Sequence, residues 1–128
     1  MNDQHHSFEQ IKQTDENGIE YWSARELAPV LEYRDWRNFL KVIDKSIQAC
    51  SSSGQHVNDH FVEATKMVTL GSGAERELAD IKLSRYACYL VVQNGDPSKP
   101  VIAAGQTYFA IQTRRQELAD DTSLQNLN

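Results

Sequence analysis

Basic and amide side chains recur along residues 34–48 with a spacing that suits nucleic-acid recognition. They are Arg34, Asn38, Lys41, Lys45 and Gln48, with Arg37 beside them. Intervals of three and four residues place such a set on one face of a helix. Lysine and arginine bind phosphates, and the forked side chains of Arg, Asn and Gln read the edges of bases. The pattern predicts a helix that binds DNA through Arg34, Arg37, Asn38, Lys41 and Lys45.

An ordinary solvated helix face is the alternative interpretation of the same residues. A surface helix carries charged side chains on its outer face by default. Asp35 and Asp44 lie within the stretch and dilute its positive charge. Both interpretations stay open on the sequence alone.

A second basic pair, Arg114-Arg115, falls in the last turn of another predicted helix. The two guanidinium groups are candidates for binding a protein partner or phosphates. The alternative is that they complement the negative end of the helix dipole, where cations are favoured.

Two further motifs have some of the residues of a metal or phosphate site and lack the rest. His56 and His60 are spaced for zinc on one helix face, but no Glu follows the first His and no third ligand is evident. The segment 71–74, Gly-Ser-Gly-Ala, lacks the lysine of a phosphate-binding loop and is typical of a hairpin turn. We therefore predict that the protein binds neither a metal ion nor a cofactor.

No set of residues in the chain has the arrangement of a catalytic site. Cys88 lies in apolar sequence, where a thiolate is destabilised, and Ser84 suits a helix cap. No two carboxylates are placed for general acid and base roles. We expect a protein that is not an enzyme, with Cys50 and Cys88 as buried thiols typical of a cytoplasmic protein.

The basic stretch belongs to a predicted helix-turn-helix-like pair. Ser23 and Glu26 form a capping box that starts a helix over about 24–32, in which Pro29 is awkward. The spacing Ala24-x-x-Leu-Ala-x-x-Leu is usual for the first helix of this motif, whereas Glu32 stands where glycine is common.

The second helix of the pair starts at the cap residue Asp35 and reaches about residue 50. Its amphipathic pattern is the cleanest in the chain. The expected apolar stripe consists of Trp36, Leu40, Ile43, Ile47 and Cys50, with Phe39 beside it.

Two hairpins are predicted around these helices. Asn17-Gly18 between apolar runs indicates a hairpin with strands near 8–13 and 18–22. A second hairpin turns at 71–73, after a strand that contains Met67, Val68 and Leu70. The residues before that strand are expected to form a short helical turn that includes Phe61, Val62 and Ala64.

Residues 84–119 are predicted to be the core, as two buried helices joined by a tight turn. Ser84 is a suitable N-cap for the apolar run 86–92, and Asn94-Gly95 tolerates positive φ where that helix stops. A short buried strand is the alternative for 86–92, since this run contains two β-branched residues. The second helix has an apolar stripe of Val101, Ala104, Tyr108, Ile111 and Leu118.

Length and composition limit the class of protein. The 128 residues suit one domain, and 40% hydrophobic residues are enough for a core. A net charge of −5 argues against sequence-blind binding to nucleic acid or anionic lipid, but leaves room for a local basic face. The N-terminus lacks the apolar region of a signal peptide, and no apolar run approaches the about 18 residues of a membrane span. We expect a cytoplasmic protein without a membrane partner.

Several segments resemble the DNA-damage-inducible protein D family. They are WSAR at 22–25, DHF at 59–61, LSRYACYL at 83–90, QNGDP at 93–97, QTYFA at 106–110 and QTRRQEL at 112–118. The resemblance covers most of residues 8–121. More distantly, the chain is similar to the BRO N-terminal domain of viral and phage antirepressors, a module associated with DNA binding.

The resemblance implies a bacterial or phage protein of the SOS response without known enzymatic activity. DNA and the RecA recombinase filament are the partners that it implies, and homo-oligomerisation stays open. Family members continue into a second segment. We predict a small α+β domain over 8–119 between flexible tails at 1–7 and 120–128. Its predicted order is an N-terminal hairpin, the helix-turn-helix-like pair, a second hairpin and the buried helical pair. The alternative function is a protein-interaction module that acts on the RecA filament with little contact to DNA.

Overall fold

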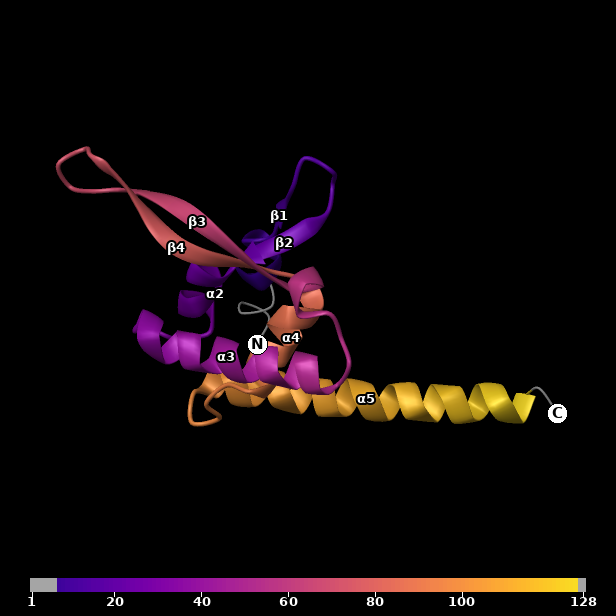
Figure 1. Cartoon of the computed structure of the whole chain (residues 1–128). Coiled ribbons are helices and arrows are strands. Elements are labelled where there is room, and N and C mark those ends of the chain that lie inside the picture. The colour runs from indigo at the N-terminus through magenta and orange to yellow at the C-terminus, as the bar shows by residue number, and fades with distance from the viewer. Residues whose placement is uncertain (1–6, 127–128) are drawn as a thin grey trace.

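A four-stranded antiparallel sheet runs across the computed structural model, which describes residues 7–126 (Figure 1). Its strand order is β1-β2-β4-β3, so the two hairpins join where β2 (Glu20–Ser23) pairs with β4 (Glu75–Leu83). β1 (Gln13–Thr14) and β3 (Phe61–Thr69) are the edges of the sheet. Helices cover one side of this sheet, and the predicted α+β class is confirmed.

The N-terminal segment forms the predicted hairpin only in part. Residues 7–10 are a helical turn, so the strand expected near 8–13 is reduced to β1. Phe8 stacks on Trp22 with ring centroids 4.5 Å apart, and its carbonyl accepts the indole N–H of Trp22 at 2.8 Å. Packing on Trp22 therefore overrides the strand pattern. Residues 1–6, which include His5-His6 and most of the predicted tail, lie outside the described residues.

The long β3–β4 hairpin extends past the helices, as Figure 1 shows. Nine residue pairs join its strands, from Phe61 opposite Leu83 to Thr69 opposite Glu75. The expected helical turn over Phe61, Val62 and Ala64 is wrong, because these residues belong to β3. The turn lies just before them, as the 3₁₀ helix η1 (Val57–Asp59). Pairing with the last residues of β4, from Asp80 to Leu83, decides between the two conformations.

Helix α2 (Ala24–Val30) and helix α3 (Trp36–Ser52) are the predicted helix-turn-helix-like pair. The side chains of Ser23 and Asp35 cap them, as expected. After α2 the Tyr33 N–H donates to the Ala28 carbonyl at 2.8 Å, and the Glu32 N–H donates to the Pro29 carbonyl at 3.0 Å. These two bonds form a Schellman motif, which ends a helix with one residue in the left-handed conformation.

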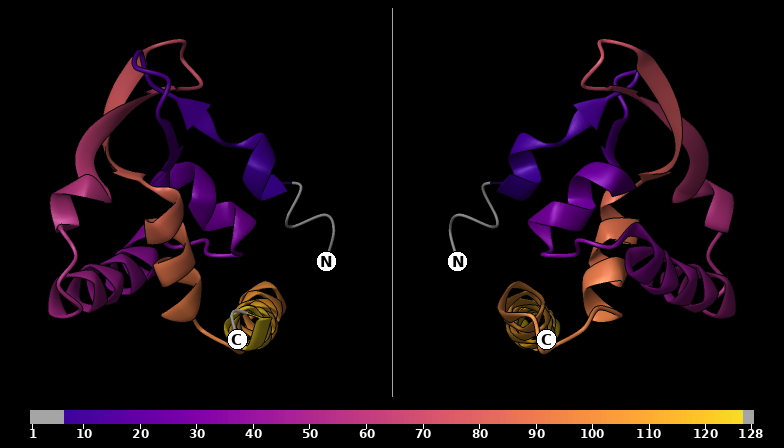
Figure 2. Two further views of the ribbon diagram at one scale, coloured as in Figure 1. Left: turned by 90° about the vertical axis from the view of Figure 1, so that its right-hand side faces the viewer. Right: turned by 90° about the vertical axis from the view of Figure 1, so that its left-hand side faces the viewer.

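Helix α4 (Arg85–Gln93) stands between α3 and α5 (Pro100–Asn126), as both views in Figure 2 show. The Ser84 side chain accepts the Ala87 N–H, which confirms the predicted cap and excludes a strand over 86–92. The fully buried core joins the sheet to the α-helices α2, α3, α4 and α5, through Trp22, Leu27, Phe39, Ile43, Leu83, Val91 and Ile102.

The turn between α4 and α5 contains Gly95, where a side chain would clash with α5. Asn94 ends α4 with φ −97°, and Gly95 is not among the residues with positive φ, so the expected left-handed stop is wrong. A Cβ on Gly95 would lie 2.9 Å from Cδ1 of Ile102. The absent side chain lets the turn pack on the buried start of α5.

Only the first part of α5 lies in the core. Val101 and Ile102 are buried, whereas Tyr108, Ile111 and Leu118 are each 48% exposed. The expectation that these three residues form a core stripe is therefore wrong. The helix also continues to Asn126, through residues 120–126 of the predicted tail, and its second half projects from the rest of the domain (Figure 1). No helix of residues 7–126 is long and apolar enough to span a membrane.

Candidate nucleic-acid interface

The outer face of α3 carries most of the predicted DNA-binding residues. Arg37, Asn38, Lys41 and Lys45 are exposed on this helix, whereas Arg34, which was expected on it, is exposed in the turn before the cap residue Asp35. The opposite face is buried and includes Phe39, Val42, Ile43, Ser46 and Cys50. The apolar stripe is rotated from the expected one, since Trp36, Leu40 and Ile47 are only half-buried. The rotation follows from packing on α4, while the basic residues stay in solvent.

The cations of this face have no ionic partner within residues 7–126. The ion pairs of the described chain involve Lys12, Lys66, Arg85 and Arg114. Asp35, the acidic neighbour of Arg34, accepts the Arg37 backbone N–H at 2.8 Å as the cap of α3. Its carboxylate is thus held at the helix start, and the basic side chains are available to an external anion.

An open cleft of about 1040 Å³ lies beside the start of α3. Its wall on one side is α2 and the turn into α3, and on the other it is the loop after α4. The lining includes two residues of the basic face, Arg34 and Asn38, so the cleft and the face are continuous. The remaining charged and aromatic lining residues are Arg25, Glu32, Tyr33, Asp35, Trp36, Asp96 and Lys99.

Two cation–aromatic contacts shape this cleft. The Arg25 guanidinium lies 4.1 Å from the centre of the Trp36 ring, and its Nε–H donates to the Ala79 carbonyl at 2.6 Å. Lys99 Nζ lies 4.7 Å from the centre of the Tyr33 ring and donates to the Glu32 carbonyl at 3.0 Å. Sequence patterns did not indicate Arg25 or Lys99, because each meets its aromatic partner across the tertiary structure.

Arg114 and Arg115 lie on the projecting half of α5. They are exposed and precede the helix end at Asn126 by several turns, so the expected place in the last helical turn is wrong. Arg114 Nη1 pairs with Glu117 Oε1 at 3.1 Å within the helix. The two arginines are therefore too far from the negative end of the helix dipole to complement it. Binding of a partner or of phosphates stays the open interpretation.

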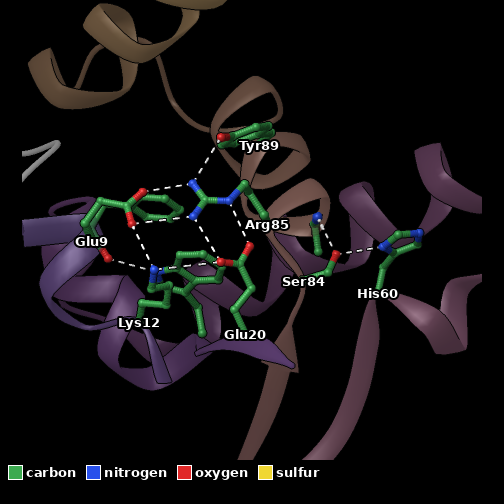
Figure 3. A network of polar contacts seen from close by, with 10 residues as sticks. Glu9, Lys12, Glu20, His60, Ser84, Arg85 and Tyr89 are labelled. Atoms are coloured by element: carbon green, nitrogen blue, oxygen red, sulfur yellow. Dashed lines mark hydrogen bonds and ion pairs between the residues drawn. The ribbon is translucent and has the colours of Figure 1, made fainter. Parts of the chain in front are cut away.

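Arg85 at the start of α4 organises a polar network that the sequence did not reveal (Figure 3). Its guanidinium donates to Glu9 Oε1 at 2.8 Å and to Glu20 Oε2 at 2.9 Å, and it lies 4.9 Å from the Trp22 ring centre. The hydrogen bond from Arg85 holds the pKa of Glu20 below its ordinary value, and the two carboxylates raise the pKa of Arg85. The network fixes the N-terminal turn on α4.

His60 lies beside the start of α4 and contacts its cap residue. Its Nδ1 lies 2.7 Å from Ser84 Oγ, the cap of α4, and its ring packs on Tyr86 at 4.6 Å (Figure 3). Among residues 7–126 no group of three or more His, Cys, Asp and Glu side chains could hold a metal ion. Burial raises the pKa of the Cys88 thiol, and also that of Cys50, so neither is activated as a nucleophile.

The fold and the site together define a small α+β domain that presents the basic second helix of a helix-turn-helix-like pair. The model of the BRO family, N-terminal domain, matches residues 10–110. The chain therefore belongs to the BRO family through this N-terminal domain.

The chain is also 60% identical over 127 residues to DNA damage-inducible protein D of Escherichia coli (strain K12). The match covers 99% of this chain and 46% of that relative, so the chain spans about half the relative's length. The resemblance noted in the sequence is thereby confirmed. No solved structure matches the chain.

Proposed function

We propose that this domain is a non-enzymatic DNA-binding module of the DNA-damage response. The observation that supports it is the outer face of α3 with the turn before it, where four cations and Asn38 are exposed and the cations lack ionic partners within residues 7–126. A duplex major groove admits a helix, whose cations then bind phosphates while amide side chains reach base edges. The name of the E. coli relative supports a role after DNA damage.

The test is the salt dependence of DNA binding by a Lys41→Ala/Lys45→Ala variant. Each phosphate contact that a substitution removes lowers the slope of log K against log salt by about 0.9 on duplex DNA. The double variant is expected to lower the slope by roughly 1.8 with little change in stability, since exposed substitutions stay within about 0.5 kcal/mol. Asn38→Ala is expected to weaken only cognate sites, by about 1–3 kcal/mol.

A matched control removes two lysines elsewhere. Lys12→Ala/Lys82→Ala makes the same change in net charge, but these residues lie by the N-terminal strands and on β4. The slope of this control is expected to equal that of the wild type. An unchanged slope for the α3 variant, or an equal change for the control, would show that the basic face is a solvated surface that does not bind DNA.

The second candidate function is a protein-interaction module on the RecA filament. The projecting, exposed half of α5 with Arg114 and Arg115 favours it, because a helix free of the core is accessible to a large partner. Binding to preassembled filaments distinguishes the two. Loss of binding in Arg114→Ala/Arg115→Ala, with none in Lys41→Ala/Lys45→Ala, would support the interaction module over direct DNA binding.

A further inference from the structure

The cleft at the start of α3 has the shape and chemistry of a site for one nucleotide. It is concave, whereas the rest of the basic face is a convex helix surface. The Trp36 ring borders it and is half-buried, although tryptophan in this position was expected in the core. A partly exposed aromatic ring beside a cationic helix is a surface on which a base can stack.

The charges of the lining favour a neutral base over a free anion. Three cations, Arg25, Arg34 and Lys99, are offset by three carboxylates, Glu32, Asp35 and Asp96. Such a balanced site offers little net attraction to an isolated phosphate. Carboxylates and the Asn38 amide can instead accept and donate hydrogen bonds at a base edge. The phosphate of the same nucleotide would contact Arg34, which is exposed at the rim.

An unpaired base suits the cleft better than a base within a duplex. In a duplex both faces of each base are covered by stacking, and a convex helix, not a concave cleft, fits the major groove. A base that has left the stack presents a free face, and aromatic and guanidinium planes then receive it. The Arg25 guanidinium covers one side of the Trp36 ring, and the two planes together offer a surface on which a base can stack.

We propose that the cleft binds one unpaired nucleotide of DNA, with its base on the Trp36–Arg25 platform and its phosphate at Arg34. The proposal rests on the DNA-binding function proposed above and adds its strand preference. The backbone continues from the cleft along α3, since Arg34 and Asn38 belong to both surfaces. The domain would therefore prefer single-stranded or gapped DNA to an intact duplex.

The two tryptophans provide the readout. Trp22 is fully buried, and Trp36 is accessible beside the cleft. Titration with a short single-stranded oligonucleotide is expected to quench the tryptophan fluorescence of the wild type. A blunt duplex of the same sequence, with G·C-clamped ends, is expected to leave the tryptophan fluorescence unchanged. The two titrations are compared at equal saturation of the protein, which the anisotropy of a label on the DNA measures. Trp36→Phe is expected to lose the quenching and keep the affinity, because phenylalanine preserves an aromatic face.

A Trp36→Leu variant tests the energetic role of stacking. It is expected to weaken single-strand binding roughly 5- to 150-fold and to leave duplex binding unchanged. Thermal melting checks that the variant folds, and Trp36→Phe serves as the aromatic-preserving control. Single-strand binding without a change in Trp36 emission would overturn the cleft proposal, and so would an equal loss of affinity for both DNA forms. A wild-type domain that binds neither form would instead overturn the DNA-binding function itself.

Discussion

Glu32 holds a left-handed backbone conformation, φ 65°, at the point where α2 turns toward α3. It is the C′ residue of the Schellman motif, a position that glycine usually occupies. Glycine is common at this place in helix-turn-helix sequences, so its absence weakened the match in sequence. The structure shows that the backbone keeps the turn nevertheless, at the cost of about 1–2 kcal/mol for a residue with a Cβ.

Replacing Glu32 by glycine is expected to stabilise the domain by about 1 kcal/mol, since the strain is relieved and part of the gain is lost to the flexible unfolded chain. The exposed side chain makes no hydrogen bond within residues 7–126, and the contact to Lys99 uses the backbone carbonyl. Denaturant unfolding measures the change. Glu32→Ala keeps a Cβ and is expected to show no such gain; equal stabilisation by both variants would assign the effect to charge.

The Arg85–Glu20 pair predicts a dependence of stability on pH. Its hydrogen bond lowers the pKa of Glu20 below the ordinary 4.5, so the pair stabilises the fold at neutral pH. This contribution is lost as the pH falls through the lowered folded-state pKa of Glu20. The side chains are 34% and 38% exposed, which limits the effect to about 1 kcal/mol or less.

The measurement compares the wild type with Glu20→Gln. The wild type is expected to be the more stable at neutral pH, and the difference is expected to vanish once the pH has fallen below the lowered folded-state pKa of Glu20, where both side chains are uncharged. Glu16→Gln, in the exposed turn of the first hairpin, is the control and is expected to show no difference at either pH. A difference that persists in acid would mean that packing, rather than charge, distinguishes Glu20 from glutamine.

At the scale of elements, the crossing of α4 and α5 depends on a second glycine. A Cβ on Gly105 would lie 2.7 Å from Cγ1 of Val92. Valine has little freedom about χ1 and cannot move away easily. Helix propensity alone predicts that alanine at position 105 would stabilise α5 by about 1 kcal/mol, so packing and propensity make opposite predictions here.

Gly105→Ala is expected to destabilise the domain by about 1–3 kcal/mol, as is usual for an overpacked contact. Adding Val92→Ala removes the clash. The double variant is therefore expected to lose less free energy of unfolding than the two single variants lose together. Denaturant unfolding of the wild type and of all three variants gives the double-mutant cycle that measures this coupling. Additive effects, or stabilisation by Gly105→Ala alone, would show that the two helices can separate freely.

At the level of the whole molecule, the net negative charge comes from outside residues 34–45. The stretch 34–45 carries four cations and two acids, 4 − 2 = +2, in a chain of net charge −5. Exposed acids occur instead on the long hairpin, at Glu63, Glu75 and Glu77, and on the distal part of α5. A local basic face therefore coexists with an acidic protein, which favours oriented binding over sequence-blind association with a polyanion.

The distal part of α5 is expected to contribute little to the stability of the domain. Residues beyond 112 have exposed side chains wherever these are described, and the buried part of the helix ends well before them. Deleting residues 114–128 is expected to leave the melting temperature almost unchanged. By contrast, Ile102→Ala should cost about 2–5 kcal/mol, since that side chain is fully buried. A large loss of stability on deletion would show that the projecting helix packs on the domain in solution.

The features that depend on local interactions could be predicted from the sequence. Caps at Ser23, Asp35 and Ser84, the turn at Asn17-Gly18 and the basic face of α3 all follow from short-range patterns, because their partners lie within one or two turns. Which apolar patterns reach the core depends on contacts between separate elements, and local patterns do not reveal them. Phe8 packs on Trp22 instead of extending a strand, Phe61 pairs with Leu83, and Tyr108 stays exposed.

The candidate site divides in the same way. The predicted residues Arg37 to Lys45 are neighbours along α3, and Arg34 directly precedes its cap, so periodicity was enough to bring them together. The cleft joins Arg25 and Trp36 to Asp96 and Lys99, whose separation in the chain no local pattern spans. Their meeting depends on the packing of α3 and α5 against α4, which buries apolar area that only the complete fold brings together.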